Sequence, residues 1–273
     1  NSTNMIELFK IKKISLGALI LLLSSCAYFN TFYNAKQYFE EAEKIRIEKD
    51  GSDIPITAIE KYSKTIKKCQ KVIDDYSDSK YAIEATLLMA KCRFYKSDYD
   101  VAINNLDMIL NNGSDNEMEE ARYWKALCKW KKGNTQAALN ELNILIEEGT
   151  IKEFQSKYHM SLAEIFKEIN DEELTLYHLE NAAKLSKGRE EKSIIYSRLA
   201  ETAFNRNDLY LAEESYNKII SNSLSKEKIE DAHLQILKIL RIQKKYSLAE
   251  KKIRGMLVDE KFLRIAGELE LEL

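Results

Sequence analysis

The chain has 273 residues, of which 45% are hydrophobic and 32% charged, and this composition excludes intrinsic disorder. One proline and eight glycines are too few for the turns of an all-β or doubly wound fold, so a largely helical protein is predicted. With 42 basic and 44 acidic residues, the formal charge of −2 gives no general attraction to nucleic acid.

Residues 1–25 have the composition of a lipoprotein signal peptide whose start is expected at Met5. Three lysines precede an apolar run over residues 14–23, which is shorter than the roughly 20 residues that a membrane-spanning helix needs. The segment Leu23-Ser24-Ser25-Cys26 resembles the bacterial lipobox, whose cysteine is acylated and becomes the mature N-terminus. Cys26 is therefore the predicted lipidation site, and the alternative is an ordinary secretory signal in which Cys26 is incidental. Removing residues 1–25, which carry three lysines and one glutamate, takes the charge from −2 to −4.

The next segment, residues 26–33, is aromatic and is expected to lie close to the membrane. Its rings either sit at the bilayer interface or cap the first helical hairpin. The second reading is slightly favoured because Asn30 and Asn34 suit a helix start. No Gly/Ser-rich linker follows Cys26, so a flexible tether is not expected.

The first predicted hairpin has a helix from about residue 34 to 49, a loop over 50–55 and a long helix ending near Tyr76. The second helix carries apolar residues at three- and four-residue steps, which defines one buried face. A lysine stripe runs opposite that face: Lys61, Lys64, Lys68 and Lys71. Such a stripe is commonly a solvated face, and the functional alternative is attraction to anionic head groups or an acidic partner.

The rest of the chain repeats every 36 or 37 residues. One series of mostly small residues runs Ala90, Ala126, Ala163, Ala200 and Leu237, and a second follows twelve residues behind it: Ala102, Ala138, Thr175, Ala212 and Ala249. Each pair brackets a short polar turn: Ser97-Asp98, Gly133-Asn134, Asn170-Asp171, Asn207-Asp208 and Lys244-Lys245. Each unit is therefore predicted to be a helical hairpin whose small residues allow close helix packing, and neighbouring units must stack to bury their faces.

This pattern resembles the tetratricopeptide repeat, most closely over residues 88–102, and the resemblance covers roughly residues 34–259. It implies an all-α, right-handed superhelical array of about six tetratricopeptide-like hairpins over residues 34–273. The repeats lack the family's frequent inter-repeat proline and exceed its usual length of 34 residues. Residues 73–81 and the hairpin after them also resemble the BamD-type lipoproteins of the outer-membrane β-barrel assembly machinery, although six hairpins are expected here where that family has five.

The resemblance also implies a partner-binding groove lined by the first helices of the repeats. Carried over to the second and third units, its residues are Glu84, Leu87, Lys91, Phe94, Glu120, Tyr123, Leu127 and Trp130. Phe94 and Trp130 are equally well explained as packing between repeats. The equivalent positions of the fourth unit are far more polar, so binding is expected toward the N-terminal half.

No catalytic, metal or cofactor site is predicted, and the chain is not expected to be an enzyme. His159, His178 and His233 are expected to fall in different hairpins, outside any metalloprotease spacing, and no phosphate-binding glycine loop occurs. Cys69, Cys92 and Cys128 are interpreted as small core residues, since equivalent positions on neighbouring helices point in parallel directions.

Two functions fit these expectations. The first is a scaffold in the cell envelope, anchored by its lipid most naturally to the periplasmic face of the outer membrane, that binds protein partners and acts in outer-membrane protein assembly. The second is a spacer associated with cell-wall or division proteins. Neither involves nucleic acid or a small-molecule substrate.

Overall fold

The computed structural model describes residues 30–47, 54–77 and 79–273. The predicted signal peptide, Cys26 and most of the loop over residues 50–55 lie outside the described residues. Within these ranges the chain is all-α and forms no strand. None of the helices there combines the length and apolar character needed to span a bilayer.

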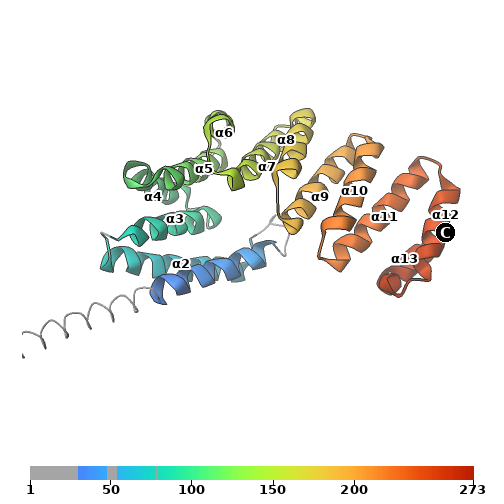
Figure 1. Ribbon diagram of the computed structural model, residues 1–273, viewed down its shortest axis with the longest axis horizontal. Coiled ribbons are helices and arrows are strands. Elements are labelled where there is room, and N and C mark those ends of the chain that lie inside the picture. The colour runs from blue at the N-terminus through green and yellow to red at the C-terminus, as the bar shows by residue number, and fades with distance from the viewer. Residues whose placement is uncertain (1–29, 48–53, 78) are drawn as a thin grey trace, which may run out of the picture. The chain divides into compact units, whose positions relative to one another are not determined.

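A first helix over residues 30–47 is followed by alternating helices that run back and forth in consecutive pairs (Figure 1). These are α2 (Ile56–Asp75), α3 (Lys80–Tyr95), α4 (Tyr99–Asn112), α5 (Asp115–Lys131), α6 (Thr135–Glu148), α7 (Lys152–Glu168), α8 (Glu172–Leu185), α9 (Arg189–Asn205), α10 (Leu209–Asn222), α11 (Lys226–Ile242) and α12 (Tyr246–Leu257), then a 3-10 helix η1 (Glu260–Ile265) and α13 (Ala266–Leu271). The described chain thus contains the predicted array of six hairpins, with η1 and α13 packed on the last of them.

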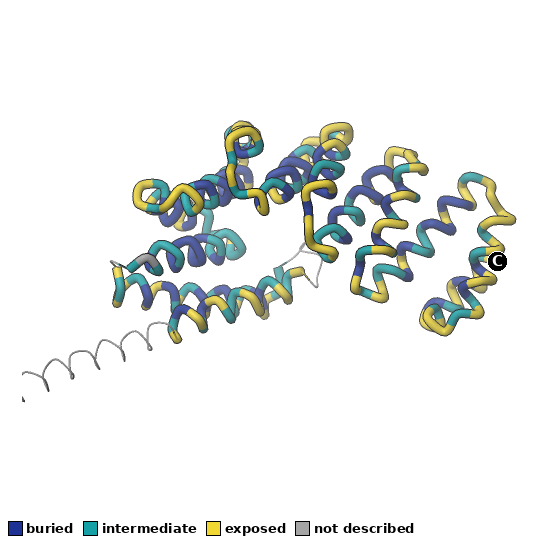
Figure 2. The backbone as a smooth tube through the Cα atoms, in the orientation of Figure 1, coloured by how far each residue is buried: buried dark blue, intermediate teal, exposed yellow. Residues whose placement is uncertain are grey.

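The chain divides into two compact units between Glu141 and Leu142, inside α6. In the N-terminal unit, α3 packs against α2, α4 and α5. In the C-terminal unit each helix from α7 to α12 packs against the next. Figure 2 shows that buried residues lie on the sides of the helices that face their neighbours, as expected for hairpins that stack.

Both small-residue series lie at helix contacts, as predicted. Every member is at most 1% exposed except Ala249, which is half-buried. Leu106, Leu142 and Leu179 fill the space beside them and are also fully buried. The sequence period therefore identifies the packing positions of both units.

The turn inside each hairpin from the second to the sixth contains one residue in the left-handed conformation. These residues are Ser97, Gly133, Asn170, Asn207 and Lys244, with φ between 59° and 86°. In every case the next residue's N–H donates to the carbonyl five residues back, for example Asp98 to Arg93 and Lys245 to Leu240, both at 2.9 Å. These bonds satisfy helix C-terminal carbonyls in the manner of a Schellman motif and fix the predicted turns.

The first helix already includes residues 30–33, before the predicted start near Asn34. Phe32 is 4% exposed and shares a core cluster with Ala35, Cys69 and Leu88, and its ring centroid lies 6.1 Å from that of Tyr81. Tyr33, by contrast, is 51% exposed. Of the two readings of this aromatic segment, packing on the first hairpin therefore describes Phe32.

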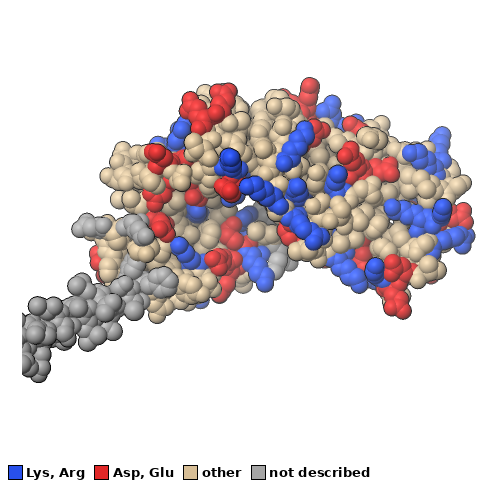
Figure 3. All heavy atoms as spheres, viewed as in Figure 1, with Lys and Arg blue, Asp and Glu red and all other residues tan. Residues whose placement is uncertain are grey.

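Ion pairs in the C-terminal unit join successive hairpins at a spacing of 34 residues. Examples are Lys167 with Glu201 at 3.4 Å, Glu172 with Arg206 at 3.8 Å and Glu153 with Lys187 at 3.8 Å. Equivalent positions of successive hairpins are 37 residues apart, whereas the paired residues are 34 apart. Each side chain therefore pairs with a residue that lies about one helical turn before its equivalent position in the next hairpin. Basic and acidic side chains are accordingly interspersed on the face shown in Figure 3.

Candidate functional site

The eight residues of the expected groove lie on α3 and α5, the first helices of the second and third hairpins, and all belong to the N-terminal unit. We call these eight residues the candidate face. Leu87, Tyr123, Leu127 and Trp130 are buried, with exposures between 6% and 9%. Glu84, Lys91, Phe94 and Glu120 are half-buried. The accessible surface of the candidate face is therefore supplied mainly by one aromatic ring and three charged groups.

Two ion pairs link the candidate face across neighbouring hairpins. Lys36 of the first helix lies 3.2 Å from Glu84 on α3, and Lys91 on α3 pairs with Glu120 on α5. The Glu120 carboxylate also accepts a hydrogen bond from Nε1 of Trp124 at 3.3 Å. The side chains of Lys91 and Glu120 are largely shielded from water, so this pair fixes side-chain positions more firmly than the exposed Lys36–Glu84 pair does.

Two rings of the candidate face, Phe94 and Tyr123, belong to a larger aromatic cluster. It consists of Tyr62, Phe94, Tyr95, Tyr99, Tyr123 and Trp124. The Phe94 ring centroid lies 5.3 Å from that of Trp124 in an edge-on arrangement and 5.7 Å from that of Tyr99. Tyr95 stacks on Tyr62 at 5.0 Å, so the rings run continuously from α2 through α3 to α5. Edge and stacked contacts of this kind hold Phe94 in one orientation.

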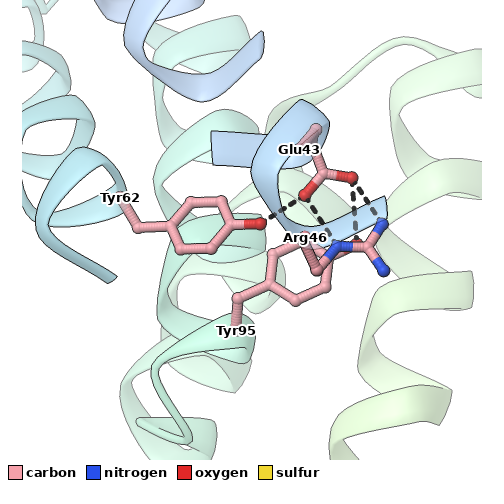
Figure 4. A network of polar contacts seen from close by, with 4 residues as sticks. All are labelled: Glu43, Arg46, Tyr62 and Tyr95. Carbon is pink, nitrogen blue, oxygen red and sulfur yellow. Dashed lines mark hydrogen bonds and ion pairs between the residues drawn. The ribbon is translucent and has the colours of Figure 1, made fainter. Parts of the chain in front are cut away.

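A polar network that the sequence analysis did not identify fixes the far end of this cluster (Figure 4). The Glu43 carboxylate accepts hydrogen bonds from the Tyr62 hydroxyl at 2.5 Å and from Nε and Nη2 of Arg46 at 3.1 and 2.7 Å. The guanidinium of Arg46 lies over the Tyr95 ring, 4.7 Å from its centroid. The only sequence signal was the i,i+3 spacing of Glu43 and Arg46, since Tyr62 lies on the apolar stripe of α2 and Tyr95 occupies an ordinary repeat position.

Burial and the Glu43 charge explain the ionisation of these groups. Both raise the pKa of Tyr62, and they do the same to Tyr95, so the phenols stay neutral. Burial alone would lower the pKa of Arg46, but its hydrogen bonds to Glu43 and the nearby negative charge outweigh burial, and the net shift is upward. The network is thus a permanent ion pair with a neutral tyrosine donor, which favours positioning over proton transfer.

The three cysteines described in the structure are free and buried, as predicted for small core residues. Burial raises the pKa of Cys69 and of Cys128 to about 12 and also raises the pKa of Cys92, so these thiols stay protonated and poorly nucleophilic. Within the described ranges, no three His, Cys, Asp or Glu side chains converge as metal ligands.

The expectation that the three histidines fall in different hairpins is wrong for two of them. His159 on α7 and His178 on α8 belong to the same hairpin, and their Nδ1 atoms lie 2.9 Å apart. The error arose because the two residues flank the turn of one unit at helical positions that face each other. Both rings are buried, and that of His178 stacks on Phe166 with a centroid distance of 5.4 Å. The pair is a packing contact of the fourth hairpin.

These features define an all-α array of stacked helical hairpins with a partly exposed aromatic and charged face. Residues 30–159 match the family profile of the tetratricopeptide repeat-like domain. No curated protein sequence matches the chain.

Two solved structures, one of them a TPR protein by its description, are similar in fold. TTC0263, a thermophilic TPR protein of Thermus thermophilus, aligns with a TM-score of 0.50 and 13% identity over 76% of this chain and 98% of its own. BtubC (BKLC) from P. vanneervenii aligns with a TM-score of 0.54 and 12% identity over 78% of this chain and 89% of its own. At these identities the likeness establishes the fold alone. Repeat arrays of this kind are typically interaction scaffolds that use their extended surfaces to bind other proteins.

Proposed function

We propose that the chain is a lipid-anchored interaction scaffold of a bacterial cell envelope, placed on the periplasmic face of the outer membrane. The lipobox-like Leu23-Ser24-Ser25-Cys26 segment supports the anchor. The resemblance to BamD-type lipoproteins supports a role in outer-membrane protein assembly, in which the partner is a segment of another envelope protein.

The main observation in favour of a binding role is that neighbouring aromatic rings pack against Phe94 and fix its orientation. This half-buried ring packs against Tyr99 and Trp124. Trp124 also contacts the Lys91–Glu120 pair, since its Nε1 donates to Glu120 and Nζ of Lys91 lies 6.0 Å from its ring centroid. A rigid aromatic residue beside charged groups is the typical composition of an interface hot spot, because little conformational entropy is lost when it binds. The candidate face therefore suits an extended or helical segment that presents an apolar side chain and both signs of charge.

A charge swap separates partner binding from folding. Lys91→Glu or Glu120→Lys alone places like charges together, whereas the double variant restores an ion pair with its polarity reversed. If the candidate face binds the partner, the double variant should regain most of the stability that the single variants lose, apart from the Trp124 hydrogen bond that a lysine at position 120 cannot accept, but not wild-type binding. Phe94→Ala should weaken binding by about 2 kcal/mol.

The measurement is site-specific photocrosslinking in native membranes from a probe at Glu84, with a probe at the exposed Asn217 on α10 as control. Crosslinks to a defined envelope protein that depend on Phe94 and on the native ion-pair polarity support the proposal. Crosslinks that survive both changes would place the binding surface elsewhere. Fractionation of Cys26→Ala tests the anchor separately, because a variant that is still processed and fully membrane-bound would contradict lipidation at Cys26.

A further inference from the structure

One end of the first hairpin carries six lysines and no acidic residue. The end consists of residues 30–39 of the first helix and residues 61–73 of α2. We call its lysines the lysine face: Lys36, Lys61, Lys64, Lys67, Lys68 and Lys71. The predicted mature chain is acidic overall, so this local excess of positive charge is a departure from the composition of the protein.

Helix packing brings these two segments together. Phe32 and Ala35 share a core cluster with Cys69 and Val72, so the start of the first helix lies beside the C-terminal half of α2. The ring of Tyr38 lies between the segments, with Nζ of Lys61 and of Lys64 at 5.5 and 5.8 Å from its centroid. The six lysines therefore belong to one end of one hairpin, although up to 35 residues separate them in sequence.

Most of the lysine face has no carboxylate partner. Lys36 pairs with Glu84, and Lys61 pairs with Glu41. The other four form no ion pair within the described part of the chain, and Lys64, Lys67 and Lys71 are exposed. This differs from the C-terminal unit, where ion pairs recur between successive hairpins. These four lysines lie within two helical turns of α2 and give that stretch a local positive potential, although Glu60 and Asp74 lie just outside it on the same helix.

The lysine face is also close in sequence to the proposed anchor. Residue 30 follows Cys26 by four residues, a stretch that spans at most about 14 Å when fully extended. The Debye length at physiological salt is about 8 Å, so charges held near the bilayer sense its surface potential. The exposed Tyr33 is a residue type that favours the membrane–water interface.

We propose that the lysine face docks on an anionic lipid surface and so fixes how the first hairpin lies on the membrane. The inference rests on the proposed anchor at Cys26, which keeps the hairpin near the head groups. An acidic protein segment has matching charge as well, but only a lipid surface is placed beside these lysines by the tether itself. The chemistry is charge attraction to lipid phosphates, which weakens as salt rises.

The test uses the full-length lipidated protein in vesicles of phosphatidylcholine, with or without 30% phosphatidylglycerol. A fluorophore is attached in the Gln70→Cys variant, whose native Cys69, Cys92 and Cys128 are buried and poorly reactive. Acrylamide, a neutral quencher, reports how far water reaches the label. We expect the quenching constant to fall about threefold in anionic vesicles at low salt and to recover at high salt. The quenching constant of a label in the Asn217→Cys variant should be the same in both vesicle types.

Two sets of charge changes complete the design. The triple change Lys64→Glu, Lys67→Glu and Lys71→Glu should abolish the protection. The matched triple change Lys218→Glu, Lys245→Glu and Lys251→Glu, at exposed lysines of the C-terminal unit, should leave it intact. If the glutamate variant fails to fold, the triple change Lys64→Gln, Lys67→Gln and Lys71→Gln provides the same comparison, because it neutralises the three charges without reversing them.

Flotation of the vesicles separates the anchor from the lysine face. Protein that floats with both vesicle types but shows no anionic protection keeps the anchor and overturns the inference. Protein that floats only with anionic vesicles, in a lysine-dependent manner, supports the inference and contradicts the anchor. Protection that survives the lysine changes would show that the lysine face does not cause it and would overturn the inference.

Discussion

The left-handed residue in the turns of the second to sixth hairpins sets a local requirement that the chain meets with four different residue types. Gly133 adopts φ +86° without a side chain, whereas Ser97, Asn170, Asn207 and Lys244 adopt similar angles with one. The Cβ of an L-residue is strained in this conformation, and asparagine tolerates it better than lysine does. The turns are therefore chemically unequal although their hydrogen bonds are the same.

Substituting two glycines by alanine tests this requirement. A Cβ at Gly133 or at Gly255 would meet no atom within 4 Å, so only backbone preference distinguishes the sites. Gly133→Ala should lower the free energy of unfolding by about 1 kcal/mol, while Gly255→Ala, inside α12, should raise it by about 0.5–1 kcal/mol. Urea denaturation measures both. Changes of the same sign would show that the left-handed turn does not control stability.

The Glu43 network predicts an asymmetric response to truncation. Glu43→Leu leaves the Arg46 guanidinium and the Tyr62 hydroxyl without their acceptor in a partly buried site, so a loss of about 2–3 kcal/mol is expected. Tyr62→Phe keeps the stacked ring and removes one donor, at about 1 kcal/mol. Glu40→Leu is the control, because Glu40 only accepts a hydrogen bond from Gln37 at 3.3 Å on the surface. Equal effects of the two glutamate changes in thermal unfolding would contradict a structural role for the network.

At the scale of the element, the repeat period predicted the hairpins because packing positions recur in every unit. Ala90 and Ala102 are buried in the second hairpin, and Ala200 and Ala212 are buried at the equivalent positions of the fifth, so one pattern locates several packing positions. The Glu43 network and the histidine pair occur once each and join residues from different helices, so no period indicates them. The candidate face was located by its repeat positions, but the burial of Tyr123 and Trp130 depends on side-chain packing that spacing does not determine.

The histidine pair makes the fourth hairpin sensitive to acid. Burial lowers the pKa of His159, and burial with the His159 neighbour lowers the pKa of His178 to about 4. Since an unfolded histidine has a pKa of about 6.5, the unfolded chain binds more protons between these values. The stability present above pH 6.5 is therefore lost progressively as the pH falls toward 4.

Replacing both histidines isolates this effect from the titration of carboxylates. In the double variant His159→Gln and His178→Gln, the loss of stability between pH 7 and 4.5 should be smaller than in the wild type by about 1 kcal/mol, since solvent partly screens the charges. The measurement is urea unfolding at a series of pH values. The slope of the free energy of unfolding against pH is compared between the wild type and the double variant, because their absolute stabilities differ for other reasons. Parallel profiles would show that the pair does not titrate differently on folding.

At the scale of the whole molecule, the array couples chiefly neighbour to neighbour. Within each unit, helix contacts join consecutive helices from α2 to α5 and from α7 to α12, with α3 and α5 as a further close pair. The boundary between the two compact units falls inside α6, so damage to one need not spread to the other. Inter-hairpin ion pairs add little free energy individually, and the apolar contacts of the small residues carry the coupling.

Overpacking one small position tests how far that coupling extends. Ala200 on α9 is fully buried against Ile219 of α10 and Ala232 of α11, so Ala200→Leu should cost about 1–3 kcal/mol. Amide exchange should accelerate in α8 to α11, while α3 and α5 keep their protection, because local opening follows nearest-neighbour contacts. Glu201→Leu, at the adjacent exposed position of the same helix, should leave exchange nearly unchanged. Loss of protection in both units would show a single cooperative block, and no loss in either would contradict the assignment of Ala200 to a helix contact.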